Sequence, residues 1–320
     1  MNIDKEIDQL VDIIGDEVKQ LAAREPHGLY EPIRYILSQG GKRLRPLLAL
    51  LTYRAFCPEG AVEEVAPVMK AVETFHNFTL IHDDIMDDAP MRRGEPTVYK
   101  KWGANVGILS GDAMLVEAYR CLESIRPEYL GQIFSLFNTM ADAICRGQQY
   151  DLEFETTPLS SLTIGSYLRM ISLKTSALFR GSMVMGATVA GASVEDREHV
   201  AQAAELMGLA FQIMDDYLDV YGEAKFGKRK GGDIIDRKKT WLLLRLYECD
   251  PRRAEEALAI ESEADRIASV TNLYEQWNIH AEALRQVDQY TEAALEELRA
   301  LSVDTSALEH IISTLTGRAV

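Results

Sequence analysis

The sequence has few of the features that mark secreted, zinc-binding or membrane-spanning proteins. Its 320 residues include four cysteines, which form no C-x-x-C pair and are spaced too widely for an obvious zinc site. No apolar run approaches the roughly 18 residues of a membrane span. The acidic, amphipathic start MNIDKEIDQLVDIIGDEVKQL lacks the basic and apolar parts of a signal peptide. We therefore expect a reduced, cytoplasmic protein without a transmembrane segment.

Positive charge is also scarce. The chain carries 34 lysines and arginines against 50 acidic residues, a formal net charge of −16. Nucleic acids and anionic membranes both reward a basic surface, so we expect no nucleic-acid partner. The charge balance does not exclude a small anion bound locally. An apolar content of 47% is enough to form a substantial core.

Helical periodicity dominates the chain. In the first segment, apolar residues recur every three or four positions, which forms one stripe on a helix: Ile3, Ile7, Leu10, Ile14, Val18 and Leu21. The segment Leu159–Asp250 contains no proline, which leaves room for several long helices. Alternating strand patterns joined by Asn-Gly or Asp-Gly turns are missing. These patterns predict an all-α fold, a single-domain bundle over residues 1–320 with about ten or more helices around a central cavity.

An acidic cluster, DDIMDD, ends an apolar helix that is predicted to begin near Pro67. Asp83 and Asp84 precede Asp87 by four and three residues, so their carboxylates share one helical face. Carboxylates about 4 Å apart repel by roughly 4 kcal/mol at an effective dielectric constant near 20, and a helix C-terminus disfavours anions. A divalent cation would relieve this repulsion. A single cluster of this kind is equally consistent with a solvated helix end.

A second cluster repeats the D-D-x-x-D spacing. The sequence FQIMDDYLDVYG places Asp215, Asp216 and Asp219 on another apolar helix. Carboxylate oxygens with few other donors suit Mg²⁺, which keeps several waters and is completed by substrate phosphates. If the two helices face each other, magnesium ions between them would stabilise a diphosphate leaving group.

Basic residues accompany the acidic clusters. The sequence GGKRLR at residues 40–45 precedes a helix, and Arg92 and Arg93 follow the first cluster. Arginine forks bind phosphate oxygens in pairs, and lysine adds a point charge. The Gly-Lys pair is not a P-loop, because the spacing and the following Ser or Thr are missing. Either basic run alone is typical of a solvated loop, but next to metal sites it indicates phosphate binding.

The motifs FTLIHDDIMDDAPMRRG, FQIMDDYLDVYG and GGKRLRP, in these positions, resemble those of the trans-type isoprenyl diphosphate synthases, in particular short-chain farnesyl and geranylgeranyl diphosphate synthases. The similarity runs from about Lys42 to Trp241. The resemblance implies the isoprenoid synthase fold and a homodimer. It also implies head-to-tail (1'-4) condensation of isopentenyl diphosphate with an allylic partner, namely dimethylallyl, geranyl or farnesyl diphosphate.

The same resemblance assigns residue roles. A cluster of three magnesium ions, or two or three depending on the ligands present, would be held by six aspartates: Asp83, Asp84, Asp87, Asp215, Asp216 and Asp219. Four residues would bind isopentenyl diphosphate: Lys42, Arg45, His76 and Arg93. The allylic diphosphate and the cation derived from it would contact six more: Arg92, Lys174, Thr175, Gln212, Lys228 and Lys238. Except for Lys238, these six form the expected catalytic set together with Asp83, Asp84, Asp87 and Asp215. The basic segment Gly222–Lys239 is a candidate lid.

Product length depends on the helix turn before the first cluster. Thr79 and Phe78 lie four and five residues before Asp83, about one turn below the metals. An aromatic fifth residue is expected to close the pocket after a few isoprene units, although Phe78 could also be a simple core residue. An aromatic fifth residue with a non-aromatic fourth resembles the pattern of C20-making members of the family, with C15 as the alternative. Three further residues could shape the pocket floor: Phe75, Met114 and Leu115.

Other functions fit the motifs less well. A class I terpene cyclase usually replaces the second D-D-x-x-D, and a head-to-head synthase would lack the GGKRLRP pocket. A non-catalytic regulatory subunit typically loses one aspartate motif, and both are intact here. A structural calcium protein would need an EF-hand spacing, which is missing.

Overall fold

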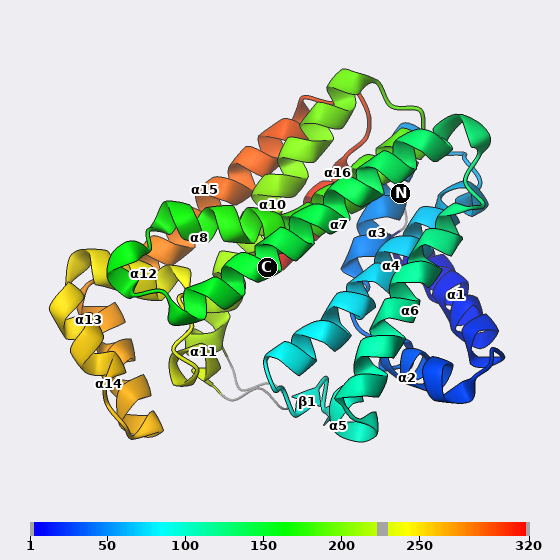
Figure 1. Cartoon of the computed structure of the whole chain (residues 1–320). Coiled ribbons are helices and arrows are strands. Elements are labelled where there is room, and N and C mark those ends of the chain that lie inside the picture. Colours follow the sequence, from blue (N-terminus) through cyan, green and yellow to red (C-terminus); the bar gives the residue numbers. More distant parts are fainter. Residues whose placement is uncertain (1–2, 223–229, 318–320) are drawn as a thin grey trace. The chain divides into compact units, whose positions relative to one another are not determined.

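The computed structural model describes residues 3–222 and 230–317 and confirms the all-α prediction (Figure 1). The chain divides into two compact units. Unit 1 comprises Met1–Thr139, Arg180–Ala201 and Leu301–Leu308, and unit 2 comprises Met140–Phe179, Gln202–Ala300 and Glu309–Val320. None of the described helices combines the length and apolar composition that crossing a membrane requires. The assignment to one domain stays a prediction.

Unit 1 is built around two neighbouring helices, α4 and α6, which Figure 1 shows side by side. A two-residue antiparallel hairpin, β1–β2, follows α4 and pairs Arg92 with Glu95. The elements of this unit are α1 (Ile3–Ala22), α2 (His27–Ser38), α3 (Leu44–Phe56), α4 (Val62–Met86), β1 (Met91–Arg92), β2 (Glu95–Pro96), α5 (Val98–Trp102), α6 (Ala104–Leu122) and the first part of α7 (Pro127–Thr156).

Helix α4 begins at Val62 rather than near Pro67, so the predicted start was wrong. Glu63 and Glu64 occupy the first turn, where carboxylates interact favourably with the helix dipole. Proline is most common in a first turn but is here accommodated one turn later. The aspartate cluster stands at the other end, where α4 ends at Met86.

Side chains from several helices bury a core in unit 1. One cluster joins residues of α1, α2, α4, α5 and α6: Leu21, Ile33, Ile36, Leu37, Ile81, Val98 and Met114. Helix α6 approaches α4 closely at Gly111, where a Cβ atom would lie under 3 Å from the ring of His82. The small residue therefore sets the spacing of the two helices beside the aspartate cluster.

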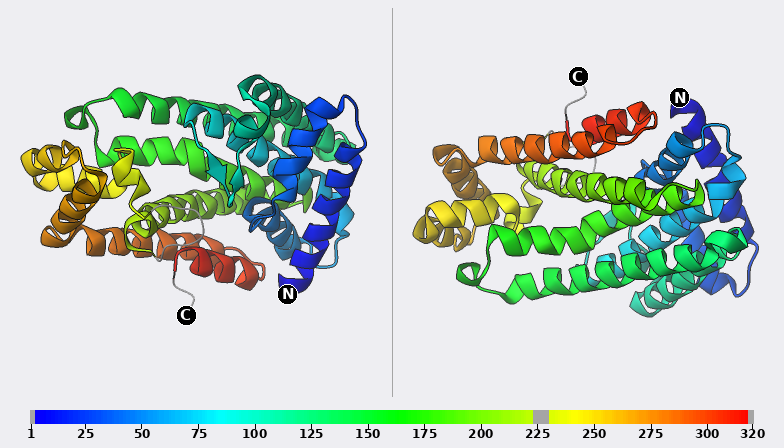
Figure 2. Two further views of the ribbon diagram at one scale, coloured as in Figure 1. Left: turned by 90° about the horizontal axis from the view of Figure 1, so that it is seen from below. Right: turned by 90° about the horizontal axis from the view of Figure 1, so that it is seen from above.

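Unit 2 consists of helices that precede and follow a π-helical turn along the chain. Figure 2 shows α12, α13 and α14 gathered near the start of α15. The elements are the last part of α7, the short turn η1 (Leu159–Ser161), α8 (Ile164–Ile171), the π-turn η2 (Ser172–Ser176), α11 (Gly232–Ile235), α12 (Trp241–Cys249), α13 (Pro251–Leu258), α14 (Glu263–Gln276) and α15 (Ile279–Arg299). Helices α9 (Ala177–Val189), α10 (Val194–Tyr221) and α16 (Ser306–Leu315) contribute to both units.

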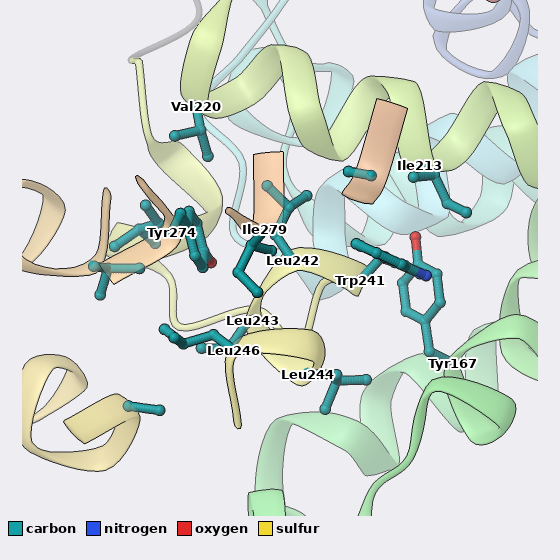
Figure 3. Packing of buried hydrophobic residues seen from close by; sticks show 14 of the residues in the cluster. Tyr167, Ile213, Val220, Trp241, Leu242, Leu243, Leu244, Leu246, Tyr274 and Ile279 are labelled. Carbon is teal, nitrogen blue, oxygen red and sulfur yellow. The ribbon is translucent and has the colours of Figure 1, made fainter. Parts of the chain in front are cut away.

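The core of unit 2 positions the second aspartate helix, α10. Figure 3 shows Tyr167 beside Trp241, with the Tyr167 hydroxyl directed towards the helix that carries Ile213. The ends of the short helices are fixed by side chains. Thr163 caps α8 in a capping box with Ser166, and other caps serve α12 and α13.

Candidate active site

The first aspartate cluster lies where α4 ends in unit 1. Asp83 and Asp84 are in the last turn, and the backbone N–H of Asp87 donates to the carbonyl of Asp83 at 2.8 Å. Asp84 is 1% exposed, whereas Asp87 is exposed. The Arg92 guanidinium on β1 reaches the Asp84 carboxylate with Nε at 2.9 and 3.0 Å and Nη2 at 2.7 Å. Burial raises the pKa of Asp84, and Arg92 opposes that rise.

Three arginines lie near enough to His76 on α4 for their charges to act on it. Burial of the ring lowers the pKa of His76 well below its usual value, and the nearby charges of Arg45, Arg93 and Arg92 lower it further. Burial also lowers the pKa of Arg45 to about 10, although the Glu73 carboxylate opposes this. His76 is therefore a neutral ring among cations, which is a favourable place for an anionic ligand.

The GGKRLR segment meets Arg93 directly. The Arg93 guanidinium donates to the carbonyl of Gly40, and a Cβ on Gly41 would lie 3.0 Å from the same guanidinium. Gly41 also has φ +130°, in the region that favours glycine. Lys42 is exposed next to this contact. Three of the four residues expected to bind isopentenyl diphosphate, Arg45, His76 and Arg93, thus come together.

The sequence reasoning missed Glu73 and Asn77, which lie on α4 close to His76 in the chain; Glu73 also interacts electrostatically with Arg45 and Arg93. Glu73 is 5% exposed, and Asn77 Nδ2 donates to its Oε1 at 3.2 Å and to its carbonyl at 2.9 Å. Burial raises the pKa of Glu73, while Arg45 and two other arginines oppose the rise. The available signal was two polar residues on the apolar face of the helix, on either side of His76.

The second aspartate cluster divides by burial. Asp215 is exposed and Asp219 partly exposed, but Asp216 is 5% exposed. Asp216 Oδ2 accepts from the Tyr167 hydroxyl at 2.6 Å and the Trp241 backbone N–H at 3.1 Å. Burial raises the pKa of Asp216 to about 6 against these bonds. The three aspartates are thus not equivalent.

Thr175 and Gln212, both expected to face the allylic cation, are in contact. The Thr175 hydroxyl donates to Gln212 Oε1 at 3.0 Å, and Gln212 Nε2 donates to Asp216 Oδ1 at 3.1 Å. Lys174, before Thr175, forms an ion pair with Asp151 on α7, a partner that the sequence reasoning missed. The family resemblance predicted a role for Lys174 but not for Asp151, because a single aspartate on a helix forms no recognisable motif.

The Lys174–Thr175 pair stands on the π-helical turn η2, a feature often found at functional sites. Two glycines make room for it. A Cβ on Gly147 of α7 would lie under 3 Å from the Lys174 backbone, and one on Gly208 of α10 under 3 Å from Ser176. Two neighbouring helices therefore enclose the turn and fix its backbone.

Backbone amides that follow Lys230 donate hydrogen bonds to Asp219. The N–H of Gly231 donates to the Asp219 carbonyl at 2.8 Å, and that of Asp233 donates to Asp219 Oδ2 at 3.0 Å. Burial and the charges of Asp216 and Asp219 raise the pKa of Asp233 to about 7. Asp233, in the sequence GGD, was also missed. Lys238 is exposed, and Lys228 lies outside the described residues.

The residues expected to set product length pack within unit 1. The Phe78 ring lies between those of Phe75 and His82, with centroids 5.4 and 4.8 Å away. The Thr79 hydroxyl donates to the His76 carbonyl at 2.7 Å. Met114 is fully buried, and Leu115 is partly exposed.

With this geometry in place, comparison with known proteins identifies the family. The polyprenyl synthetase family model matches residues 26–277. The chain belongs to the polyprenyl synthetase family. As a member it is a prenyltransferase, and the family acts on isoprenoid diphosphates.

Individual polyprenyl synthetases agree with this assignment. A short chain isoprenyl diphosphate synthase of Methanocaldococcus jannaschii is 38% identical over 246 residues, 76% of this chain and 72% of the relative. A geranylfarnesyl diphosphate synthase of Aeropyrum pernix is 37% identical over 74% of this chain and 77% of its own. The crystal structure of a geranylgeranyl pyrophosphate synthase matches with a TM-score of 0.94 at 38% identity, and all of both chains is covered.

Within this polyprenyl synthetase, each unit gathers one group of the expected site residues. Unit 1 holds the first aspartate cluster, Arg92 and the group around His76, and unit 2 holds the second cluster with Thr175 and Gln212. The facing of the two aspartate clusters and the role of each residue stay predictions.

Proposed function

We propose that this prenyltransferase condenses isopentenyl diphosphate head-to-tail with an allylic diphosphate and releases a C20 diphosphate. The observation that carries the proposal is the convergence of Arg45, Arg92 and Arg93 on neutral His76, beside the buried carboxylate of Asp84. This concentration of positive charge is unusual in a chain with net charge −16. It favours the binding of a multiply charged anion.

The isopentenyl diphosphate site is assigned to Lys42, Arg45, His76 and Arg93. Arginine forks would bind the phosphate oxygens in pairs, and exposed Lys42 would add a point charge. His76, neutral at physiological pH, can donate one hydrogen bond without adding charge. This pocket needs no metal, because its own cations balance the diphosphate.

The allylic diphosphate is assigned to the two aspartate clusters. Within residues 3–222 and 230–317, no group of three or more His, Cys, Asp or Glu side chains is arranged to hold a metal ion. The donor set fits magnesium chemically, because Asp83, Asp87, Asp215 and Asp219 offer hard carboxylate oxygens with exposed or partly exposed positions. Bound magnesium, expected as three ions, would supply positive charge against the diphosphate as it leaves.

The chain's own residues complete the reaction. Arg92, Lys174 and Lys238 would bind the leaving diphosphate, with Lys228 also assigned to this role. As the C–O bond of the allylic substrate breaks, the Thr175 and Gln212 oxygens are assigned to face the cation. The double bond of isopentenyl diphosphate then forms the new C–C bond, and the released diphosphate accepts the proton that is lost.

Product length is assigned to Phe78 with Thr79. The Phe78 ring is held between Phe75 and His82 one turn before Asp83, which is the position of a wall for the growing chain. The similarity to a geranylgeranyl pyrophosphate synthase supports C20, whereas the geranylfarnesyl relative shows that a related sequence can serve a longer product. Farnesyl diphosphate, C15, is the second candidate.

A homodimer and a cytoplasmic location complete the proposal. Helix α6 exposes three large apolar side chains, Ile108, Leu109 and Val116, which a second copy would cover. All four cysteines are free thiols, in agreement with a reducing compartment. Sedimentation of the purified protein tests the dimer, and Leu109→Lys is expected to shift it towards monomer.

The decisive experiment is a product assay. Purified protein is incubated with Mg²⁺, isopentenyl diphosphate and each allylic primer in turn, and mass spectrometry identifies the products. We expect a C20 diphosphate that is lost in Asp83→Ala. No elongation with any primer would indicate a regulatory subunit, and a cyclic hydrocarbon would indicate a cyclase.

A further inference from the structure

We propose that Asp216, the middle aspartate of the second cluster, is a positioning residue that sets the orientation of the Gln212 amide and the Thr175 hydroxyl, and is not a metal ligand. The inference rests on the proposed function, because it assigns a task within the allylic half of the site. It departs from the expectation that all six aspartates bind magnesium.

The Asp216 carboxylate is committed to donors from three elements. Its Oδ2 accepts from the Tyr167 hydroxyl on α8 at 2.6 Å and from the Trp241 N–H at the start of α12 at 3.1 Å. Its Oδ1 accepts from Gln212 Nε2, one turn earlier on α10, at 3.1 Å. With 5% exposure, the side chain lies in the interior of unit 2. A metal ion could reach it only at the expense of buried donors.

The neighbouring aspartates differ. Asp215 and Asp219 are four residues apart, share one face of α10 and are exposed or partly exposed. Asp216 is rotated by about 100° from Asp215 on a helix of 3.6 residues per turn. One motif therefore divides into two residues that face outwards and one that faces the core.

The acceptor-only chemistry of a carboxylate determines the direction of the hydrogen-bond chain. Because Asp216 can only accept, Gln212 must present its NH₂ group to it. The Gln212 carbonyl oxygen then faces Thr175, whose hydroxyl must donate to it at 3.0 Å. The lone pairs of the Thr175 oxygen take no part in this hydrogen bond and are directed away from Gln212. Asp216 thereby makes the Thr175 oxygen an electron-rich group on the π-turn.

Substitution can reverse this direction while it keeps the shape of the side chain. In Asp216→Asn, the amide oxygen can still accept from Tyr167 and Trp241, but its NH₂ group faces Gln212. The Gln212 amide must then rotate, present its oxygen to Asn and turn its NH₂ towards Thr175. Adding Gln212→Glu restores an acceptor that faces both neighbours, so the hydroxyl of Thr175 donates again. The double variant D216N/Q212E also keeps the net charge.

The test compares D216N, Q212E, the double variant and D215N with wild type. In D216N we expect turnover to fall by about 10- to 100-fold, while the KM for the allylic diphosphate stays within about twofold of wild type, because Thr175 and Gln212 are assigned to the cation that forms after binding. The Mg²⁺ concentration for half-maximal activity should stay within about twofold of wild type. D215N should raise that concentration, and the double variant should regain at least about tenfold of the lost turnover.

Two readouts do not depend on activity. Binding of Mn²⁺ with an unreactive allylic thiodiphosphate, followed by electron paramagnetic resonance, should weaken in D215N but not in D216N. The midpoints of thermal unfolding form a double-mutant cycle. The midpoint should fall in each single variant and recover in the double variant. Weakened Mn²⁺ binding in D216N, or additive losses of the midpoint, would overturn the inference. Lack of elongation by wild type would instead refute the proposed function and leave the cycle interpretable.

Discussion

The Arg92 guanidinium and the Asp84 carboxylate form three hydrogen bonds of 2.7 to 3.0 Å between the β-hairpin and the last turn of α4. Asp84 is buried, while Asp87 beside the same helix end is exposed. The pair therefore fixes the hairpin, and with it Arg93, relative to the aspartate cluster.

Aspartates of the first cluster are predicted to differ sharply in importance. Asp84→Asn should reduce turnover by about 10²-fold or more, because it removes a charge from the site and breaks the pair with Arg92. Asp88→Asn is the matched control. Asp88 is exposed and bonded to Tyr99 and Lys100, so its loss should change turnover by less than about twofold. Steady-state kinetics at saturating Mg²⁺ measure both, and equal losses would contradict the assignment.

His76 predicts a pH dependence of stability. Its pKa is lowered well below 6.5 in the folded chain by burial and by Arg45, Arg93 and Arg92, with Glu73 also nearby. Below pH 6.5 the unfolded chain therefore binds more protons, and the free energy of unfolding falls as the pH falls. Between pH 7.5 and 5.5, His76→Gln should lose about 1.4 kcal/mol less than wild type. Urea unfolding at both pH values measures this, and identical changes would disprove the shift.

Phe78 is predicted to limit chain growth. Phe78→Ala removes the ring between Phe75 and His82 and should lengthen the product from C20 to C25 or longer. Phe137→Leu provides a control, because Phe137 also packs on Phe75 but is fully buried in the core. Mass spectrometry should show an unchanged product for that control. An unchanged product in Phe78→Ala would reduce Phe78 to core packing.

Gly147 is predicted to be required by the π-turn. Gly147→Ala places a Cβ under 3 Å from the Lys174 backbone, so it should lower the free energy of unfolding by about 1–3 kcal/mol and raise the KM for the allylic diphosphate.

Gly131→Ala on the same helix is the matched control. Nothing lies within 4 Å of its added Cβ, and it should stabilise the chain by up to about 1 kcal/mol. Denaturant unfolding measures the free energy of unfolding of both variants, and steady-state kinetics measure their KM for the allylic diphosphate. A tolerated alanine at residue 147 would mean that the turn can shift.

The features that the sequence predicted are local ones. The aspartate spacing and the end of α4 followed from helical periodicity, which depends only on neighbouring residues. The predicted start of α4 was wrong because Glu63 and Glu64 suit the first turn, which leaves Pro67 inside the helix. The family assignment followed from the combination of motifs.

The features that the sequence could not predict depend on tertiary packing. Glu73 and Asp233 owe their shifted pKa values to burial; Glu73 interrupts the apolar face of α4, but how deeply it is buried depends on the helices packed against it. The different surroundings of Asp215 and Asp216 depend on Tyr167 and Trp241, which are distant in sequence. The π-turn likewise requires glycines on two other helices.

The backbone amides held by the second cluster constrain how the sequence can diverge. Asp219 accepts from the N–H groups of Gly231 and Asp233, and Asp216 from that of Trp241, so this stretch is attached at three points. An insertion or deletion between Gly231 and Trp241 would move an amide away from its carboxylate. Among homologous chains, changes of length should therefore accumulate between Gly222 and Lys230 and be rare between Gly231 and Trp241.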